Sequence, residues 1–338
     1  MIEPAAAASA EALVTVRDLV KHYGPPVSLL ERMTGNRGRP VRALDGVSLD
    51  VMAGETLGVI GESGCGKSTL GRTILRLHEP TSGTVRFDGV DVLGLGAEDL
   101  KAMRQRMQII FQDPYASLNP RSTVEDILVS PILLHKIADR RGARDMAAAM
   151  VENVGLKTAY LKRFPHQFSG GQRQRIGIAR ALILKPDFVL CDEPVSALDV
   201  SIQAQIIQLL GELKRELGLT YMFISHDLAV IGYVADRVAV MYMGEIVEFG
   251  RTREVLDTPR HPYTQALLSA VPRVHEGQHR ERIKLEGDPP SPMNPPAGCK
   301  FHTRCPNAME CCGEAIPRLV EDRMGRLVSC HLVHGVAA

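Results

Sequence analysis

Short apolar runs alternate along the chain with longer stretches in which apolar residues recur at helical spacing. The runs at 56–60 and 188–191 are almost wholly apolar, which is typical of strands buried in a parallel sheet. The expected strands cover residues 13–20, 48–51, 56–60, 84–87, 107–111, 188–191, 221–224, 237–243 and 245–249. The last two strands flank Gly244 and predict a hairpin. Strands that alternate with helices favour an α/β fold.

Helical spacing is most continuous between residues 114 and 184. The expected helices cover residues 69–77, 143–154, 173–184 and 202–217. Residues 25–40 are basic and turn-rich and predict a loop insertion, whereas the proline-rich stretch at 289–296 indicates a linker or a rigid wrapped segment. We therefore predict a first domain at 11–257, with a helical subdomain at about 114–184, and a cysteine-rich C-terminal extension at 258–338.

Composition narrows the class of protein further. Hydrophobic residues make up 45 % and charged residues 23 % of the chain, as in ordinary globular proteins. Lys and Arg total 40 against 39 Asp and Glu, so no strong field attracts nucleic acid, and we expect no nucleic-acid partner. No apolar run approaches the roughly 18 residues of a membrane span. The start Met1-Ile2-Glu3-Pro4 lacks the basic residues of a secretory signal, so we expect a cytosolic protein.

A glycine-rich segment follows the expected strand at 56–60 and precedes an expected helix. It fits the pattern G-x-x-x-x-G-K-[ST], and its residues are Gly61, Glu62, Ser63, Gly64, Cys65, Gly66, Lys67, Ser68 and Thr69. In that context backbone N–H groups can surround phosphate oxygens, Lys67 can reach the β- and γ-phosphates, and the Ser68 hydroxyl can ligate Mg²⁺. A glycine-rich turn of no function would not need the strand and helix around it. The segment predicts binding of a nucleoside triphosphate with Mg²⁺.

Two carboxylates follow the buried run at 188–191. Asp192 can hold Mg²⁺ through water, and Glu193 can orient and deprotonate a water that attacks the γ-phosphate. An acidic turn after a strand would be the alternative, but the phosphate loop in the same chain argues against it.

A second candidate phosphate-binding element opens the helix expected at 173–184. The residues at this helix start are Ser169, Gly170, Gly171 and Gln172. Their unencumbered N–H groups and the helix dipole favour an anion. The phosphate loop, Ser-Gly-Gly-Gln and Asp-Glu, in this order, resemble the nucleotide-binding domain of an ABC ATPase. The resemblance implies a P-loop NTPase fold with a RecA-like core, and ATP as the nucleotide.

This resemblance also assigns roles to single residues. Tyr23 is similar to the aromatic residue that stacks on adenine, and Gln112 to the glutamine that touches Mg²⁺ and the attacking water. Asp199 matches the loop that crosses between two subunits, and His226 the histidine that contacts the γ-phosphate. Phe168 is a departure, because the family usually has leucine there. In this family each ATP lies between the phosphate loop of one subunit and the Ser-Gly-Gly-Gln segment of the other.

The tail narrows the resemblance. Residues 261–272 resemble the segment that follows the ATPase domain in oligopeptide and dipeptide importers and their nickel-importing relatives, and residues 298–306 and 330–332 continue the match. The insertion at 25–40 is similar to that of the second, F-type, ATPase subunit. The resemblance implies a heterodimer with a second ATPase, docked on two permease subunits at the cytoplasmic face of the inner membrane. An external binding protein delivers the substrate.

The substrate stays open on the residues alone, because an importer of this family can carry nickel or glycosides instead of peptides. Two other classes of protein fit the sequence less well. A soluble ABC ATPase that works on nucleic acid or ribosomes usually carries two such domains, a coiled-coil insertion or basic arms, and the sequence shows none of these. A small-molecule kinase with the same phosphate loop would have no use for Ser-Gly-Gly-Gln or His226.

The seven cysteines are spread unevenly. Cys65 and Cys191 stand alone, whereas five crowd the tail: Cys299, Cys305, Cys311, Cys312 and Cys330. Disulfides are disfavoured in a cytosolic protein, so the cluster indicates a metal site. The resemblance implies a [4Fe-4S] cluster held by Cys299, Cys305, Cys312 and Cys330. Zinc is the alternative metal, and Cys311 can replace Cys312 as the ligand.

Overall fold

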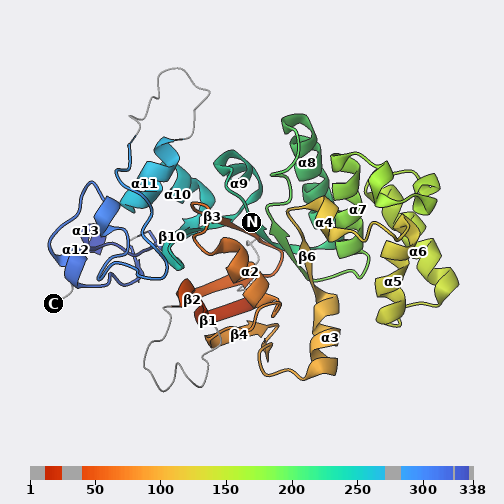
Figure 1. Cartoon of the computed structure of the whole chain (residues 1–338), viewed down its shortest axis with the longest axis horizontal. Helices are drawn as coiled ribbons and strands as arrows, with labels where there is room; N and C mark the ends of the chain where they lie inside the picture. The colour runs from red at the N-terminus through yellow and green to blue at the C-terminus, as the bar shows by residue number, and fades with distance from the viewer. Residues whose placement is uncertain (1–11, 25–39, 271–282, 323, 335–338) are drawn as a thin grey trace, which may run out of the picture. The chain divides into compact units, whose positions relative to one another are not determined.

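A computed structural model describes residues 12–24, 40–270, 283–322 and 324–334. Of the insertion expected at 25–40, all but the last residue lies outside this part of the chain. The chain forms two compact units that each combine strands and helices (Figure 1). Of the described residues, the first unit contains 12–14, 50–56 and 86–225, and the second contains 15–24, 40–49, 57–85, 226–270, 283–322 and 324–334.

Parallel strands form the centre of the first unit. Strand β7 (Phe188–Asp192) pairs in parallel with β6 (Met107–Ile110) on one side and β8 (Thr220–Ile224) on the other. Every residue of β7 and β8 is buried, which confirms the strands predicted from their apolar runs. Because the carboxyl ends of parallel strands meet at one edge, the residues that follow β6 and β7 come together there.

Helices occupy most of the stretch 114–184, within the same unit. They are α4 (Pro114–Ser117), α5 (Val124–Leu134), α6 (Arg140–Asn153), α7 (Gly170–Leu182) and two 3₁₀ turns, η1 (Thr158–Lys162) and η2 (Pro165–Gln167). Helix α6 begins earlier than predicted because the Asp139 carboxylate accepts the Gly142 N–H and caps it. Helices α3 (Ala97–Arg106) and α8 (Val200–Leu217) complete the unit's longer helices.

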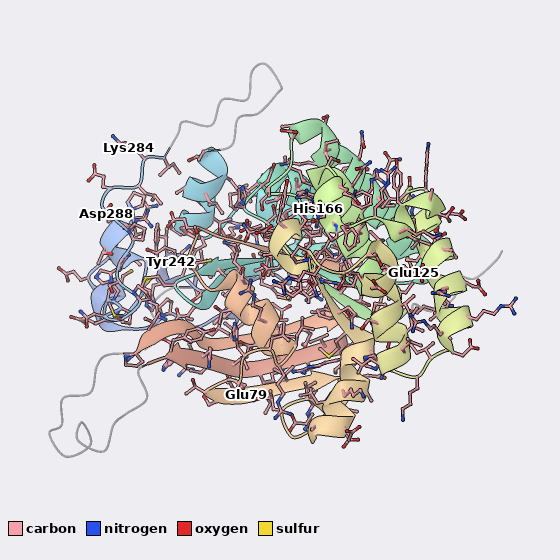
Figure 2. The ribbon with its side chains drawn as sticks, turned by 45° about the vertical axis from the view of Figure 1, so that its right-hand side comes forward. Glu79, Glu125, His166, Tyr242, Lys284 and Asp288 are labelled. Carbon is pink, nitrogen blue, oxygen red and sulfur yellow. The ribbon has the colours of Figure 1, made fainter. Side chains whose placement is uncertain are left out.

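The second unit contains the predicted hairpin. Strand β3 (Thr56–Ile60) pairs in parallel with β9 (Arg237–Tyr242), and β10 (Glu245–Arg251) returns antiparallel with Glu245 opposite Tyr242. The short strands β12 (Leu327–Val328) and β11 (Val320–Glu321), which the sequence did not predict, extend this order beyond β10. Tyr242, labelled in Figure 2, is buried at the end of β9.

A second group of strands lies in order β2 (Val41–Met52), β1 (Ala12–Tyr23) and β4 (Ser82–Phe87), and β4 turns into β5 (Val90–Asp91). Short helices precede and follow the hairpin along the chain in the second unit. They are α9 (Leu228–Val234), α10 (Thr252–Asp257), α11 (Pro262–Ser269), η3 (His302–Arg304), α12 (Cys311–Glu314) and α13 (His331–His334).

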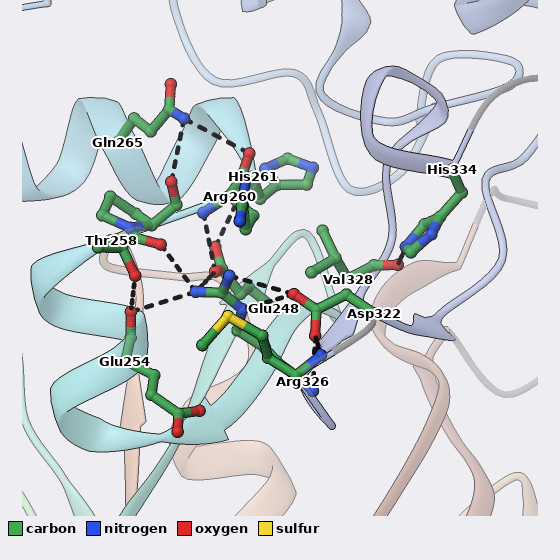
Figure 3. A network of polar contacts seen from close by, with 12 residues as sticks. Glu248, Glu254, Thr258, Arg260, His261, Gln265, Asp322, Arg326, Val328 and His334 are labelled. Atoms are coloured by element: carbon green, nitrogen blue, oxygen red, sulfur yellow. Dashed lines mark hydrogen bonds and ion pairs between the residues drawn. The ribbon is translucent and has the colours of Figure 1, made fainter.

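Buried charges join residues that follow β10 in the sequence to that strand (Figure 3). The Glu248 carboxylate is fully buried and accepts the N–H groups of Arg260 and His261, each at 2.9 Å. Arg326 lies 3.5 Å from the same carboxylate and 3.1 Å from Asp322. Since unpaired buried charges are costly, these contacts fix Arg260, His261 and Arg326 beside β10.

Candidate functional site

A tight loop joins β3 to α2 (Lys67–Ile74) in the second unit. The φ angles of Gly61, Gly64 and Gly66 are +150°, +81° and +107°. A β-carbon at Gly61 would lie 2.3 Å from the carbonyl oxygen of Met241, and one at Gly66 would lie 2.3 Å from that of Ala43. Both positions therefore require glycine, and the loop that the sequence pattern predicts is formed.

The loop leads into helix α2, whose N-terminus has no side-chain cap. Gly66, the N-cap of α2, is left-handed and provides no capping hydrogen bond. A helix start of this kind can direct its first N–H groups and its dipole toward an anion. Lys67 is 5 % exposed, and its Nζ donates to the carbonyl oxygens of Gly61 at 2.8 Å and Glu62 at 3.0 Å. The ammonium lies inside the loop, where phosphate oxygens could replace these carbonyls.

Two predicted catalytic residues meet in the first unit. Gln112 follows β6, Glu193 follows β7, and the Gln112 Nε2 donates to the Glu193 Oε2 at 3.0 Å. The Glu193 backbone is left-handed, with φ +48°, and its N–H donates to the carbonyl oxygen of Ile224 at 3.0 Å. Asp192, one residue before, is fully buried. A glutamine and a carboxylate in contact can together orient a water molecule.

Helix α7 begins with a closed capping box. The Ser169 Oγ accepts the Gln172 N–H at 3.4 Å, and the Gln172 Oε1 accepts the Ser169 N–H at 3.2 Å. Gly171 allows a close approach to α8, because a β-carbon there would lie 2.6 Å from the Ile202 Cγ2. The Ser-Gly-Gly-Gln segment is therefore a helix start held by its capping box, in which Ser169 is exposed and the other three residues are half-buried.

The remaining predicted residues lie at the ends of elements. Tyr23 ends β1 with 37 % of its surface exposed, and the Lys21 Nζ lies 4.8 Å from its ring centroid. Asp199 is the exposed N-cap of α8. His226 is exposed between β8 and the Asp227 cap of α9. Tyr23, residues 61–69 and His226 belong to the second unit, and the other predicted nucleotide residues belong to the first.

Known proteins match the chain along nearly its whole length. The family described as "ABC transporter" matches residues 44–196, and the one described as "Oligopeptide/dipeptide transporter, C-terminal region" matches residues 247–312. The Oligopeptide transport ATP-binding protein AppF of Bacillus subtilis (strain 168) is 50 % identical over 329 residues, which are 96 % of this chain and 99 % of AppF. The chain belongs to the ABC transporter family.

Further relatives agree with this assignment. The Dipeptide transport ATP-binding protein DppF of Escherichia coli (strain K12) is 50 % identical over 323 residues, 95 % of this chain and 94 % of DppF. Among solved structures, the dimeric ATP-binding cassette MJ0796 bound to ADP and Pi has a TM-score of 0.62 and 29 % identity, covering 71 % of this chain and 99 % of MJ0796. The predicted ABC ATPase is confirmed. In the part of the chain that the structure describes, no helix has both the length and the apolar character needed to cross a bilayer.

The C-terminal cysteines of this ABC subunit lie near one another without a recognisable metal site. The Cys299 N–H donates to the Cys312 carbonyl oxygen at 2.8 Å. Burial raises the pKa of the Cys299 thiol to about 11, and the charges of Cys312, Cys330 and Cys305 add to the effect. All seven cysteines are free thiols. Within the described residues, however, no three His, Cys, Asp or Glu side chains are placed to hold a metal ion, so the geometry does not support the predicted iron–sulfur or zinc centre.

Sequence reasoning missed two contacts to the phosphate loop of this ABC subunit. The Glu62 N–H donates to the Tyr263 hydroxyl, and the Glu62 carboxylate binds Arg304. Both partners lie in segments that resemble peptide importers, but nothing in their spacing indicates what they contact. Only the fold brings residues so distant in sequence together.

Proposed function

We propose that this chain is the ATP-hydrolysing motor subunit of an ABC importer for dipeptides or oligopeptides. The observation that carries the proposal is the joint presence of a formed phosphate loop around Lys67 and a Gln112–Glu193 pair at the ends of parallel strands. The match of residues 247–312 to the oligopeptide and dipeptide transporter region, together with AppF and DppF, supports peptides as the substrate class.

In the proposed mechanism, the loop amides and Lys67 bind the ATP phosphates. Glu193, oriented by Gln112, takes a proton from the attacking water as it approaches the γ-phosphate. Ser68, Gln112 and Asp192 offer the oxygen donors that Mg²⁺ prefers, and the bound ion would neutralise phosphate charge. The full burial of Asp192 suits a carboxylate that is compensated by a cation.

Other residues take the roles that the family resemblance implies. Tyr23 stacks on adenine and His226 contacts the γ-phosphate. The backbone from Ser169 to Gln172 binds the ATP held by the opposite subunit, and Asp199 lies in the crossing loop. We assign residues 11–257 to the nucleotide-binding domain, with its helical subdomain at about 114–184, and residues 258–338 to the importer-type extension.

The partners follow from the same proposal. A second ATPase subunit completes a head-to-tail heterodimer, two permease subunits form the membrane pathway, and an external binding protein supplies the substrate. The chain then works at the cytoplasmic face of the inner membrane. No role for nucleic acid is proposed, in line with the balanced charge of 40 basic and 39 acidic residues.

Transport with the natural partners tests the substrate class. We expect the partner ATPase, the permeases and the binding protein to be encoded beside this gene. The chain is produced together with them in cells without other peptide importers, and uptake of a labelled tripeptide is measured. We expect uptake that an unlabelled dipeptide or oligopeptide abolishes. If nickel or a glycoside competes instead, the substrate is nickel or a glycoside rather than a peptide. Full ATP hydrolysis in the absence of the permeases, the second ATPase and the binding protein would favour an ATPase that does not drive transport.

The proposal also includes a metal centre. Its ligands would be Cys299, Cys305, Cys312 and Cys330. The hydrogen bond that joins the Cys299 and Cys312 segments and the free thiols support it, although the described side chains are not arranged as ligands. A [4Fe-4S] cluster takes four thiolates, and zinc is the alternative. Anaerobic purification with iron and zinc determination tests it. About four irons per chain support the cluster, one zinc supports zinc, and neither metal rejects the centre.

A further inference from the structure

The second residue of the phosphate loop is held from two sides by the C-terminal part of the chain. The Tyr263 hydroxyl accepts the Glu62 N–H at 2.8 Å, across 201 residues of sequence. The two terminal nitrogens of Arg304 donate to the two carboxylate oxygens of Glu62, at 3.0 Å and 3.3 Å, across 242 residues. Both the backbone and the side chain of Glu62 are therefore fixed by residues beyond the β9–β10 hairpin.

The Arg304–Glu62 pair is largely shielded from water. The side chain of Arg304 is 8 % exposed and that of Glu62 is 30 % exposed. Burial lowers the pKa of Arg304, but its hydrogen bonds to Glu62 and Tyr242 outweigh this and raise the pKa above its usual value. The guanidinium thus stays charged, and its two parallel bonds fix the carboxylate in direction as well as distance.

Arg304 is itself held rigidly. It ends a 3₁₀ turn in which its N–H donates to the carbonyl oxygen of Phe301 at 3.0 Å. The Phe301 ring is 1 % exposed and lies 5.2 Å from the Tyr242 ring and 5.4 Å from the Tyr263 ring, centroid to centroid. The aromatic cluster of Tyr242, Tyr263 and Phe301 thus supports both residues that hold Glu62.

A second anchor from the same segment supports the other half of the loop. The Lys300 Nζ lies 2.7 Å from the Asp45 carboxylate and 2.9 Å from the Glu245 carboxylate. Glu245 follows Gly244, whose carbonyl oxygen accepts the Asp45 N–H and whose own N–H donates to the Cys65 carbonyl oxygen, each at 2.9 Å. Adjacent parts of the extension therefore hold the phosphate loop directly at Glu62 and, through Gly244, at Cys65.

We propose that Arg304 is a positioning residue for nucleotide binding, through which the C-terminal extension sets the shape of the phosphate loop. The path runs from Arg304 to Glu62 and on to Lys67, whose Nζ bonds the Glu62 carbonyl oxygen at 3.0 Å. A loop already held in its binding shape loses less entropy when phosphate binds. Loss of Arg304 frees the N-terminal half of the loop and weakens ATP binding. The inference rests on the proposed function, since it concerns the same ATP site.

A double-mutant cycle on the full chain tests this inference. ATP affinity is measured by calorimetry for wild type, Arg304→Gln, Glu62→Gln and the double variant. We expect each single variant to bind ATP roughly tenfold more weakly, and the double variant to bind no more weakly than either single one. Arg318→Gln, which changes an exposed arginine of the same extension, should bind like wild type. Melting without nucleotide identifies any general loss of folding.

Each outcome supports or overturns one claim. Wild-type chain that binds no ATP rejects the proposed function itself. If wild type binds ATP and Arg304→Gln binds it equally tightly, only the positioning role is rejected. The same holds if the losses of ATP-binding free energy in the two single variants add up in the double variant. If Arg304→Gln fails to fold, Arg304→Lys keeps the charge but not the paired bonds and should still weaken ATP binding. Tyr263→Phe removes only the second support and should weaken it as well, and unchanged affinity in both variants also rejects the role.

Discussion

Glu193 adopts an unfavourable backbone conformation that orients its side chain. Its φ of +48° is unfavourable for a residue with a β-carbon, at a cost of about 1–3 kcal/mol. The bond from its N–H to the Ile224 carbonyl oxygen holds this conformation, and Gln112 holds the carboxylate at 3.0 Å. With its backbone and its carboxylate both held, Glu193 has few alternative orientations, which suits its proposed role of taking a proton from one particular water.

Glu193→Gln should therefore bind ATP as wild type does and hydrolyse it far more slowly. The amide keeps the shape of the side chain but cannot take the proton, and loss of a general base typically costs about 10²–10⁴ in rate. Affinity is measured by calorimetry, and hydrolysis is measured in the assembled complex with the partner ATPase inactivated separately. Glu216→Gln, on the exposed end of α8, is the matched control. Hydrolysis by Glu193→Gln at the wild-type rate would remove the proposed base.

Functional residues can be predicted from the sequence when they lie close together in it. The phosphate loop and the Asp-Glu pair are visible because all their members lie within a few positions after an apolar run. The contact between Glu62 and Arg304 spans 242 residues, and neither residue is unusual for its surroundings. Such a pair follows only from the packing of whole segments.

At the scale of elements, strongly patterned segments are predicted better than short ones. Strands β3, β7 and β8 are found because their apolar runs are completely buried. The short strands β11 and β12 have too few residues to show a pattern. Strand β12 forms by pairing with the edge of β10, and β11 forms by pairing with β12. Isolated elements of this length are unstable, so their existence depends on tertiary contacts.

The start of α7 offers a test of packing between two helices. Gly171→Ala adds a methyl group that would lie 2.6 Å from the Ile202 Cγ2, so α7 or α8 has to shift. We expect this variant to lose about 1–3 kcal/mol of unfolding free energy, the usual cost of overpacking. Hydrolysis in the assembled complex should also fall, because the Ser-Gly-Gly-Gln segment moves with the helix. Denaturant unfolding and ATPase assays measure the two effects.

Gly177→Ala in the same helix is the matched control. A β-carbon at Gly177 has no atom within 4 Å, so the substitution should keep activity and stabilise the helix by up to about 1 kcal/mol. Equal losses in Gly171→Ala and Gly177→Ala would mean that a general effect of alanine, rather than the contact with Ile202, is responsible.

At the scale of the whole molecule, the proposed function gives the chain two different surfaces for ATP. The phosphate loop belongs to the second unit and the Ser-Gly-Gly-Gln helix start to the first. The resemblance to ABC ATPases implies that these two surfaces bind two different ATP molecules. Each ATP would be bound jointly by this chain and by another subunit. The solved relative MJ0796 bound to ADP and Pi is dimeric. A single chain would then hold the residues that bind ATP while lacking the opposite surface that completes each site.

Purified alone, the chain should therefore bind ATP and hydrolyse it only slowly, and hydrolysis should rise when the partner ATPase and the permeases are added. ATP affinity is measured on the isolated chain, and phosphate release is followed while the partner concentration increases, with the molecular mass recorded by light scattering at each step. A partner ATPase whose own Ser-Gly-Gly-Gln segment is altered should fail to stimulate the Lys67 site of this chain, whereas one with an altered phosphate loop should still do so. Full activity in a preparation that stays monomeric would show that the chain completes its own site, and would contradict the shared arrangement.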